Sequence, residues 1–305
     1  MALRIRRNVP TAPLSTFKIG GAAEYYVTVQ NSDAIIAALQ WAKERSLTHH
    51  IIAGGSNVVF PDGMLRGLLI HITSGGIHRT GQYHFIVDTG TLLEKLIAVS
   101  IADGLAGLET LTDIPGTVGG AIVGNAGAYG HSISESVDHV LIWDTGQTRE
   151  LTHRACNFKY RESIFKRRPY IILSTTFVLK SGNAKQLKKL SREIRAVRRK
   201  KYDRTRNCPG SFFKNVLIKD ISKRALAQID SARIIDGKIP TGYLLDSVGG
   251  RGLKRGGIQA TDFHANIIEN TGAGTAHDVR RLAGELKRRV KNEFGITLEE
   301  EVRFL

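Results

Sequence analysis

A serine after a Pro-Gly turn is the first residue of this sequence that could carry chemistry. In "RTRNCPGSFFKN", residues 204–215, Ser211 follows Pro209-Gly210 and precedes two phenylalanines, Lys214 and Asn215. Such a hydroxyl can cap a helix, attack a carbonyl, or donate a proton to a strongly basic carbon. No G-x-S-x-G elbow surrounds Ser211, which disfavours the nucleophile. A proton donor and a capping or turn serine both stay open on this evidence.

Two glycine-rich stretches could hold an anionic cofactor. They are "AGGSNVVF" (53–60) and "IPGTVGGAIVGNAGAYG" (114–130). Neither contains the G-x-G-x-x-G or the G-x-x-x-x-G-K-[ST] motif. Consecutive Gly, Ser and Asn residues at a strand end still expose backbone N–H groups that can bind a diphosphate, for example at Gly54, Gly55 and Ser56. One loop alone fits a tight turn or a close-packed crossing, but the pair favours a dinucleotide pocket.

Helices and strands must place these loops, and their irregular alternation predicts an α+β fold. Helical patterns cover 31–46 and 91–104, and strand patterns cover 47–53, 138–146 and 170–182. After a basic segment the pattern gives a strand-like stretch at 256–270, a capped helix at 275–295 and a final strand at 296–305. We therefore expect one domain over residues 1–195 and a second over 196–305.

Composition indicates a soluble globular protein of a reducing compartment. Of 305 residues, 42% are apolar and 24% are charged. No run of about 18 apolar residues is present, and no apolar region follows the basic start, so we expect a cytoplasmic protein without a membrane span or signal peptide. Cys156 and Cys208 form neither a C-x-x-C pair nor a metal-ligand array, so no metal is expected.

The charge of +16 calls for an anionic partner or substrate, and most of it is local. Residues 185–206 carry eleven Lys and Arg against two acidic residues, which is nine of the sixteen net charges. Leu187, Leu190, Ile194 and Val197 recur there at helical spacing and predict one buried stripe. An amphipathic helix with a solvated basic back is favoured over a nucleic-acid or membrane-surface patch.

Seven motifs, met in order, resemble the UDP-N-acetylenolpyruvoylglucosamine reductases (the MurB family) in its shorter type. They are "STFKIGGAAEYYV", "IIAGGSNVVF", "GLETLTDIPGTVGGAIVGNAGAYG", "FKYRESIFK", "GSFFKN", "DFHANIIENTGAGTAHDV" and "FGITLEEEVRFL". The resemblance covers residues 12–305. It implies a two-part FAD-binding domain of the vanillyl-alcohol-oxidase type (PCMH type), followed by a smaller α+β substrate-binding domain.

The resemblance also implies a reaction and a set of site residues. FAD would pass a hydride from NADPH to an enolpyruvyl UDP-sugar, with Arg161 on the substrate carboxylate, Ser211 as proton donor and Glu301 polarising the developing acid. Glu301 is preferred to its two acidic neighbours because it directly precedes the motif valine. Expected cofactor contacts are Gly54, Gly55, Ser56, Asn57, Val58, Ile114, Pro115, Gly116, Gly119, Gly120, Asn125 and Gly127. Expected substrate contacts are Tyr129, Tyr160, Lys214, Asn215, His264 and Asn266, although His264 could equally be structural.

Three positions depart from the family pattern, at Ser15, Pro209 and Val216. The reacting residue types are all retained, so the departures bear on local geometry. Two other classes of function stay open: another flavin oxidoreductase of this fold acting on a sugar or alcohol, and a basic nucleic-acid-binding protein without catalysis. We expect the reductase, acting as a monomer on a small UDP-sugar, with neither a nucleic acid nor a membrane as partner.

Overall fold

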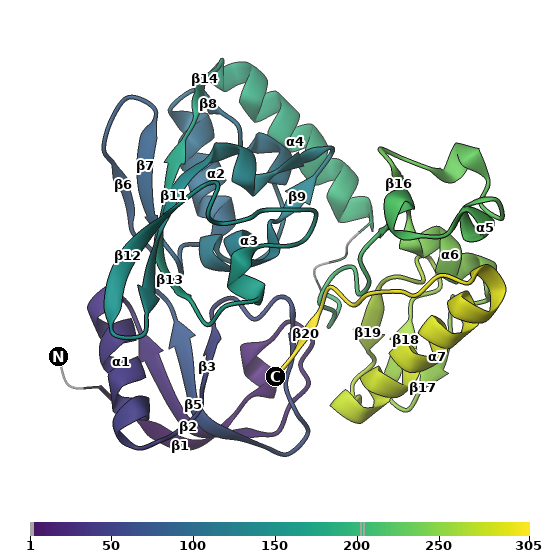
Figure 1. Ribbon diagram of the computed structural model, residues 1–305, viewed down its shortest axis with the longest axis horizontal. Helices are drawn as coiled ribbons and strands as arrows, with labels where there is room; N and C mark the ends of the chain where they lie inside the picture. Colours follow the sequence, from purple (N-terminus) through teal and green to yellow (C-terminus); the bar gives the residue numbers. More distant parts are fainter. Residues whose placement is uncertain (1–2, 202, 204) are drawn as a thin grey trace. The chain divides into compact units, whose positions relative to one another are not determined.

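The computed structural model describes residues 3–201, 203 and 205–305. Contacts divide the chain into two compact units. The first comprises Met1–Val9, Ala23–Gly54 and Arg66–Asp203, and the second comprises Pro10–Ala22, Gly55–Leu65 and Arg204–Leu305. Each unit combines segments far apart in the sequence, as the colours of Figure 1 show. The expected boundary at residues 195/196 falls inside a helix of the first unit, and a functional division there stays a prediction.

Two sheets form the frame of the first unit. One has the order β1-β2-β5-β3, from Arg6–Pro10, Ala22–Val29, Met64–Ile72 and His49–Ile52. The other has the order β12-β11-β13-β7-β6, from Gln147–Thr152, Val137–Asp144, Ile171–Val178, His84–Asp88 and Ile77–Arg79. Strand β3 runs parallel to β5, whereas the pairs of the second sheet are antiparallel. The mixed content confirms the α+β prediction.

Alternating side chains of the second sheet serve two cores. Ile142 and Ile172 belong to one core with helices α2 (Leu93–Ala102) and α3 (Val118–Gly124). Their neighbours Leu141 and Leu173 belong to another core with helix α1 (Ser32–Glu44). This is the two-residue period of a strand buried on both faces. The side chain of Asn31 caps α1 by accepting from the N–H of Ala34 at 2.8 Å, as the sequence predicts.

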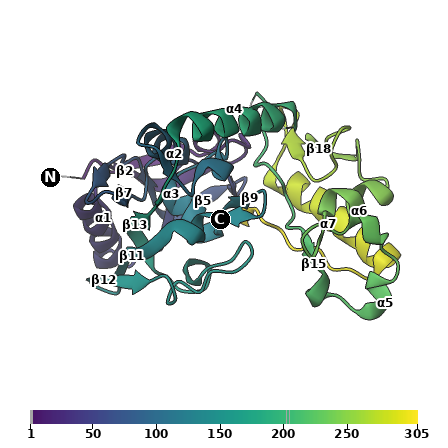
Figure 2. The same ribbon diagram turned by 90° about the horizontal axis from the view of Figure 1, so that it is seen from above.

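Helix α4 (Ala184–Lys201) carries most of the basic segment and packs against α2 (Figure 2). Residues 202 and 204 of that segment lie outside the described residues. The prediction of a single apolar stripe is wrong here. Leu187 and Ile194 are buried, but Leu190 is 39% exposed and Val197 is 58% exposed. Arg195 forms an ion pair with Glu94 of α2, so the packed side of α4 includes a cation that the apolar periodicity did not indicate.

The second unit packs short strands and three helices around its own core. The strands are β4 (Val58–Val59), β15 (Val216–Leu217), β16 (Lys238–Ile239), β17 (Lys254–Arg255), β18 (Ile258–Ala260), β19 (Ile268–Asn270) and β20 (Arg303–Phe304). Among the described residues, the α-helices of this unit are α5 (Lys223–Leu226), α6 (Thr241–Ser247) and α7 (Ala276–Phe294). The capping box at Thr275 and the left-handed Gly295 bound α7 as predicted.

The end of the chain is less regular than the expected strand over 296–305. Regular pairing covers β20 alone, which runs parallel to β4 with Arg303 opposite Val58. Upstream, the chain makes single backbone bonds to residues 212–214 instead of a continuous ladder. Among the described residues no helix is both long and apolar enough to cross a bilayer.

Candidate functional site

The first glycine loop is forced by close packing. At Gly55, which has a φ of +60°, an added Cβ would lie 1.9 Å from the carbonyl oxygen of Leu14. At Gly54 an added Cβ would lie 3.2 Å from Cα of Gly116, so the two glycine loops meet within the first unit. Gly55 therefore has a structural cause, while exposed Gly54 presents its backbone at the meeting point.

Residues 56–58 continue the loop into the second unit. Ser56 is half-buried and Val58 lies in β4 opposite Arg303. The side-chain amide of Asn57 donates to the main-chain oxygen of Glu301 at 3.0 Å. The structure thus joins a residue predicted to bind cofactor to one predicted to act in catalysis.

The second glycine loop divides into packed and open positions. At Gly119 an added Cβ would lie 1.9 Å from Oγ1 of Thr89, so this glycine belongs to a tight crossing. At exposed Gly120 the nearest atom would be 3.7 Å away, which leaves room for a side chain. Ile114 is half-buried, Pro115 is exposed, and Gly116 has a φ of +116°, which favours glycine by itself. Gly120 is the position where approach of a ligand, more than internal packing, explains glycine.

Arg161 lies against the end of this loop. Its Nη2 donates to the main-chain oxygen of Gly127 at 2.9 Å, and its guanidinium carbon lies 5.6 Å from the ring centroid of Tyr160. Nearby, Nδ2 of Asn125 donates to the oxygen of Lys159 at 2.9 Å. These bonds tie the segment of Arg161 to the loop, as the prediction of a shared site requires.

Three predicted residues of the first unit have left-handed backbones. The φ angle is 41° at Asn125, 53° at Tyr129 and 54° at Arg161. Asn125 is the C-cap of α3, where a left-handed asparagine is common, whereas the larger Tyr129 and Arg161 are strained by about 1–3 kcal/mol in this region, as residues at functional sites often are. Tyr129 is also 53% exposed, which suits a ring that contacts ligand. Backbone strain of this kind has no signature in the sequence.

In the second unit Ser211 and Glu301 lie on adjacent segments. The N–H of Glu301 donates to the oxygen of Phe212 at 2.8 Å, and Ser211 forms an isolated bridge with Ile267. Both Ser211 and Glu301 are half-buried. Position 210 is glycine with a φ of +87°, so the Pro-Gly turn directs the chain into this bridge. No helix begins at Ser211, which removes the helix-cap alternative.

Two of the three C-terminal glutamates have ion pairs within the second unit. Glu299 forms an ion pair with buried Lys214, and Glu300 forms one with Lys287 at 3.2 Å. The choice of Glu301 as the catalytic carboxylate stays a prediction.

The other predicted substrate residues support the backbone around Ser211. Asn215 accepts from the N–H of Thr241 at 3.1 Å. Nδ1 of His264 accepts from the N–H of Asn266 at 3.2 Å, and the ring lies over Gly242, where an added Cβ would approach it to 2.7 Å. His264 therefore has a structural contact, the alternative left open by the sequence.

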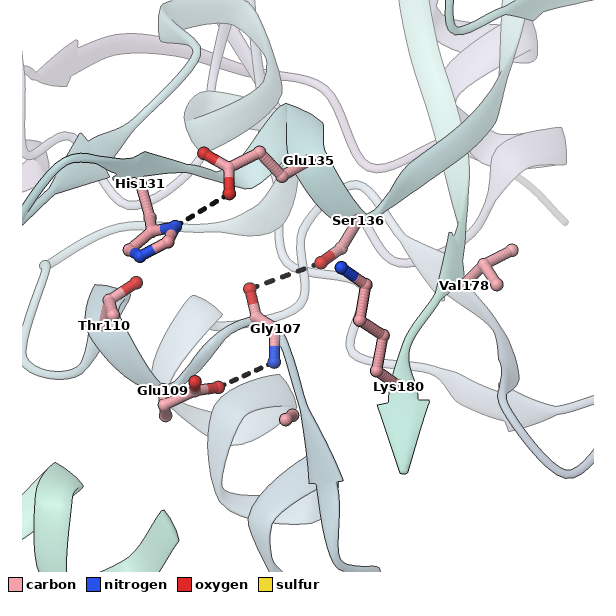
Figure 3. A pocket seen from close by; sticks show the side chains of 9 residues that line it. Gly107, Glu109, Thr110, His131, Glu135, Ser136, Val178 and Lys180 are labelled. Atoms are coloured by element: carbon pink, nitrogen blue, oxygen red, sulfur yellow. Dashed lines mark hydrogen bonds and ion pairs between the residues drawn. The ribbon is translucent and has the colours of Figure 1, made fainter. Parts of the chain in front are cut away.

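A separate cavity of about 190 Å³ lies in the first unit at β8 (Leu105–Ala106), β10 (His131–Ser132) and β14 (Lys180–Ser181) (Figure 3). Its polar groups already bind each other: His131 with Glu135 at 2.8 Å, and Ser136 with the oxygen of Gly107 at 3.2 Å. Burial opposes ionisation of Glu135, but the bonds from His131 and Ser132 outweigh it and lower the pKa. None of the predicted site residues lines this cavity.

Buried hydroxyls beside the first glycine loop test whether FAD fits. Oγ of Ser15 and Oγ1 of Thr16 are buried and hydrogen-bond to none of the described residues. The N–H of Thr16 donates to the oxygen of Gly55 at 3.1 Å, which fixes both hydroxyls next to the loop. Buried polar groups normally have partners, so these two fit a polar cofactor bound there. Thr16 was not among the predicted contacts, because only the fold brings it beside this loop.

Family models match both parts of the chain. Residues 23–148 match an FAD binding domain, and residues 200–305 match "UDP-N-acetylenolpyruvoylglucosamine reductase, C-terminal domain". These matches define a flavoprotein oxidoreductase of α+β fold, built from an FAD-binding domain and a C-terminal domain. Among described residues no cluster suited to a metal ion is present.

Full-length relatives narrow the class. The chain is 38% identical over 304 residues to the UDP-N-acetylenolpyruvoylglucosamine reductase of Solibacter usitatus, covering 99% of this chain and 97% of that protein. It is 33% identical to the protein of that name from Carboxydothermus hydrogenoformans, covering 99% and 94%. The crystal structure of the Thermus caldophilus reductase superposes with a TM-score of 0.78 at 25% identity over 99% of both chains. The chain belongs to the UDP-N-acetylenolpyruvoylglucosamine reductase family. FAD is its cofactor.

Proposed function

We propose that the protein reduces UDP-N-acetylglucosamine enolpyruvate to UDP-N-acetylmuramate in the synthesis of peptidoglycan precursors, using NADPH. FAD, held by the two glycine loops, would supply the hydride chemistry that links NADPH to the methylene carbon of the enolpyruvyl group. Addition of that hydride leaves negative charge on the α-carbon and the carboxylate of the substrate. A proton at the α-carbon then completes reduction of the double bond. The protein must therefore hold a carboxylate and deliver a proton.

The chain supplies residues for both tasks. Arg161 holds the carboxylate, for which a permanently charged planar fork is suited. Ser211 donates the proton, since a hydroxyl is an adequate acid toward a strongly basic carbon. Glu301 polarises the developing acid. Tyr129, Tyr160, Lys214, Asn215 and His264 bind or orient the sugar nucleotide.

Cofactor contacts come from both glycine loops. Gly54, Gly116 and Gly120 offer backbone without a side chain in the way, and Ser15, Thr16 and Ser56 offer hydroxyls. Gly55 and Gly119 serve by allowing the close packing that shapes the loops. The other predicted contacts, including Asn57, Ile114 and Asn125, position these residues.

The single observation that carries the proposal is the pairing of Ser211 and Glu301 on adjacent segments, through the 2.8 Å bond from Glu301 N–H to the oxygen of Phe212. It joins the two chemically demanding residues of distant motifs in one unit.

The test is a coupled assay on the purified full-length protein. A flavin absorption band should be present, and NADPH consumption should depend on added UDP-N-acetylglucosamine enolpyruvate and yield UDP-N-acetylmuramate. A flavoprotein that oxidises a sugar or an alcohol, and that does not consume NADPH when the enolpyruvyl substrate is added, would support the alternative of another flavin oxidoreductase of this fold. A colourless protein with salt-sensitive DNA binding would support the nucleic-acid alternative. We also propose that the enzyme works in the cytoplasm as a monomer on this small UDP-sugar.

A further inference from the structure

We propose that Asn266 positions the proton donor Ser211 and does not itself bind substrate. The inference rests on the proposed function, because it presumes that Ser211 delivers a proton to the substrate. It assigns Asn266 a different task from the substrate contact expected from the sequence. Three observations carry it: the bonds of the amide, its burial, and the lack of other regular structure around Ser211.

Both ends of the Asn266 amide are used on one residue of the serine segment. Oδ1 accepts from the N–H of Phe213 at 2.8 Å, and Nδ2 donates to the oxygen of Phe213 at 2.9 Å. The main-chain oxygen of Asn266 also accepts from the N–H of Phe212 at 2.8 Å. Asn266 is 2% exposed. Its side chain therefore takes the place of a neighbouring strand and has no face for a ligand.

The segment that carries Ser211 does not belong to a regular strand. Residues 211–213 form isolated bridges to Ile267 and Glu300 instead of a regular strand. The rings of Phe212 and Phe213 are buried and meet edge to face at 5.0 Å, which anchors side chains but leaves the peptide planes to be set by hydrogen bonds. The two side-chain bonds of Asn266 fix the peptide groups of Phe213, two residues after Ser211.

The same peptide units connect Ser211 to Glu301. The oxygen of Phe212 accepts from the N–H of Glu301, so rotation of the peptides at 212 and 213 would move the donor and the carboxylate relative to each other. Proton transfer depends steeply on geometry, and a shift of about 1 Å can cost about a hundredfold in rate. Loss of the Asn266 bonds should thus slow the proton-dependent half-reaction and spare hydride transfer from NADPH.

An aspartate at this position makes the role testable through pH. A neutral carboxyl can donate one hydrogen bond and accept another, as the amide does. A carboxylate can only accept, so it would be repelled by the oxygen of Phe213, which now accepts from the amide. Burial raises a carboxyl pKa. Asn266→Asp should therefore work when protonated at low pH and fail as rising pH ionises it.

Asn270→Asp is the matched control. Asn270 is also a buried amide, 6% exposed, whose Nδ2 donates to the oxygens of Phe17 and Lys18 and whose Oδ1 accepts from Gly272 and Gly274. The partners of its side chain lie outside residues 211–213. An aspartate there brings the same buried charge without touching Phe213.

The experiment is stopped-flow kinetics on the full-length holoenzyme across pH, with NADPH for flavin reduction and UDP-N-acetylglucosamine enolpyruvate for reoxidation. At pH 8, Asn266→Asp should reduce flavin within about twofold of wild type and reoxidise it about a hundredfold more slowly, with recovery of at least about tenfold on acidification. Asn270→Asp should show no such pH-dependent recovery. Asn266→Ser, which can satisfy one Phe213 group without a buried charge, should show an intermediate loss confined to reoxidation if the aspartate variant does not fold.

Two results would overturn the inference alone: equal loss in both half-reactions, or reoxidation that matches wild type at every pH. Failure of the wild-type flavin to be reoxidised by the enolpyruvyl substrate would instead overturn the proposed function, and the inference with it. Melting temperatures of each variant at each pH separate loss of fold from loss of proton delivery.

Discussion

The side-chain amide of Asn57 donates a 3.0 Å hydrogen bond to the main-chain oxygen of Glu301, across 244 positions of sequence. The same two segments pair as β4 and β20. A loop predicted to hold cofactor and a carboxylate predicted to act on substrate are thereby fixed in one unit.

Replacement of Arg161 by lysine should impair substrate reduction while leaving flavin binding intact. Lysine keeps the charge but loses the planar fork and the bond to Gly127. Hydrogen bonds to charged groups contribute about 1.5–3 kcal/mol, so kcat/KM for the enolpyruvyl substrate should fall about ten- to a hundredfold. Exposed Arg154→Lys is the control and should match wild type. An equal fall in NADPH-driven flavin reduction would argue against a carboxylate-binding role.

Adjacent glycines in α3 should respond differently to alanine. At Gly119 the new Cβ meets Oγ1 of Thr89, and overpacking should lower the free energy of unfolding by about 1–3 kcal/mol. At Gly120 the protein leaves room, so Gly120→Ala should fold normally yet bind FAD more weakly. Denaturant unfolding and FAD titration of the apoprotein separate the two effects. Wild-type FAD affinity in Gly120→Ala would show that this glycine does not approach the cofactor.

Glu285 should stabilise the second unit in a pH-dependent manner. It lies on α7 and pairs with Arg289 at 2.6 Å and with Arg255 of β17. Burial opposes its ionisation, but the hydrogen bonds from Arg289 and Arg255 outweigh it and lower the pKa. A lowered carboxyl pKa gives stability that is complete above the unfolded-state pKa and is lost as pH falls through the folded-state pKa.

The melting temperature of Glu285→Gln should therefore lie below that of wild type at pH 7. The two should converge as the solution is acidified below about pH 4, near the ordinary pKa of a glutamate. Exposed Glu293→Gln on the same helix is the control. A difference that is constant with pH would mean that packing, not charge, is what Glu285 contributes.

The two thiols should differ in reactivity. Burial raises the pKa of the Cys156 thiol to about 11, and its side chain is inaccessible. Cys208 is half-buried, in the loop before Ser211. Because the thiolate is the reactive form, a thiol reagent at pH 8 should modify at most Cys208 in the native protein and both cysteines after denaturation. Rapid modification of Cys156 in the native state would contradict the packing of its core.

Local signals carried most of the fold prediction. Asn31 and the capping box at Thr275 mark helix starts by side-chain chemistry that acts within one turn, and both helices begin there. The error at Leu190 and Val197 has a different origin. Helical spacing defines an apolar stripe, but the neighbouring elements decide which side of the helix is buried. In α4 the side that faces α2 includes Arg195, which pairs with Glu94.

The site was predictable in residue type and not in arrangement. Motif resemblance pointed to Ser211, Arg161 and Glu301, but the left-handed backbone of Arg161 depends on contacts between segments far apart in the chain. The roles of Glu299 and Asn266 likewise depend on partners, Lys214 and Phe213, more than fifty residues away in sequence. Such pairings become visible only when the fold brings the segments together.

The most direct test of the account is rapid-mixing kinetics of Ser211→Ala holoenzyme. If Ser211 gives its proton to the α-carbon of the substrate, NADPH should bleach the flavin at the wild-type rate, and the enolpyruvyl substrate should then fail to restore its colour. Restoration at the wild-type rate, or loss of bleaching to the same extent, would contradict the account.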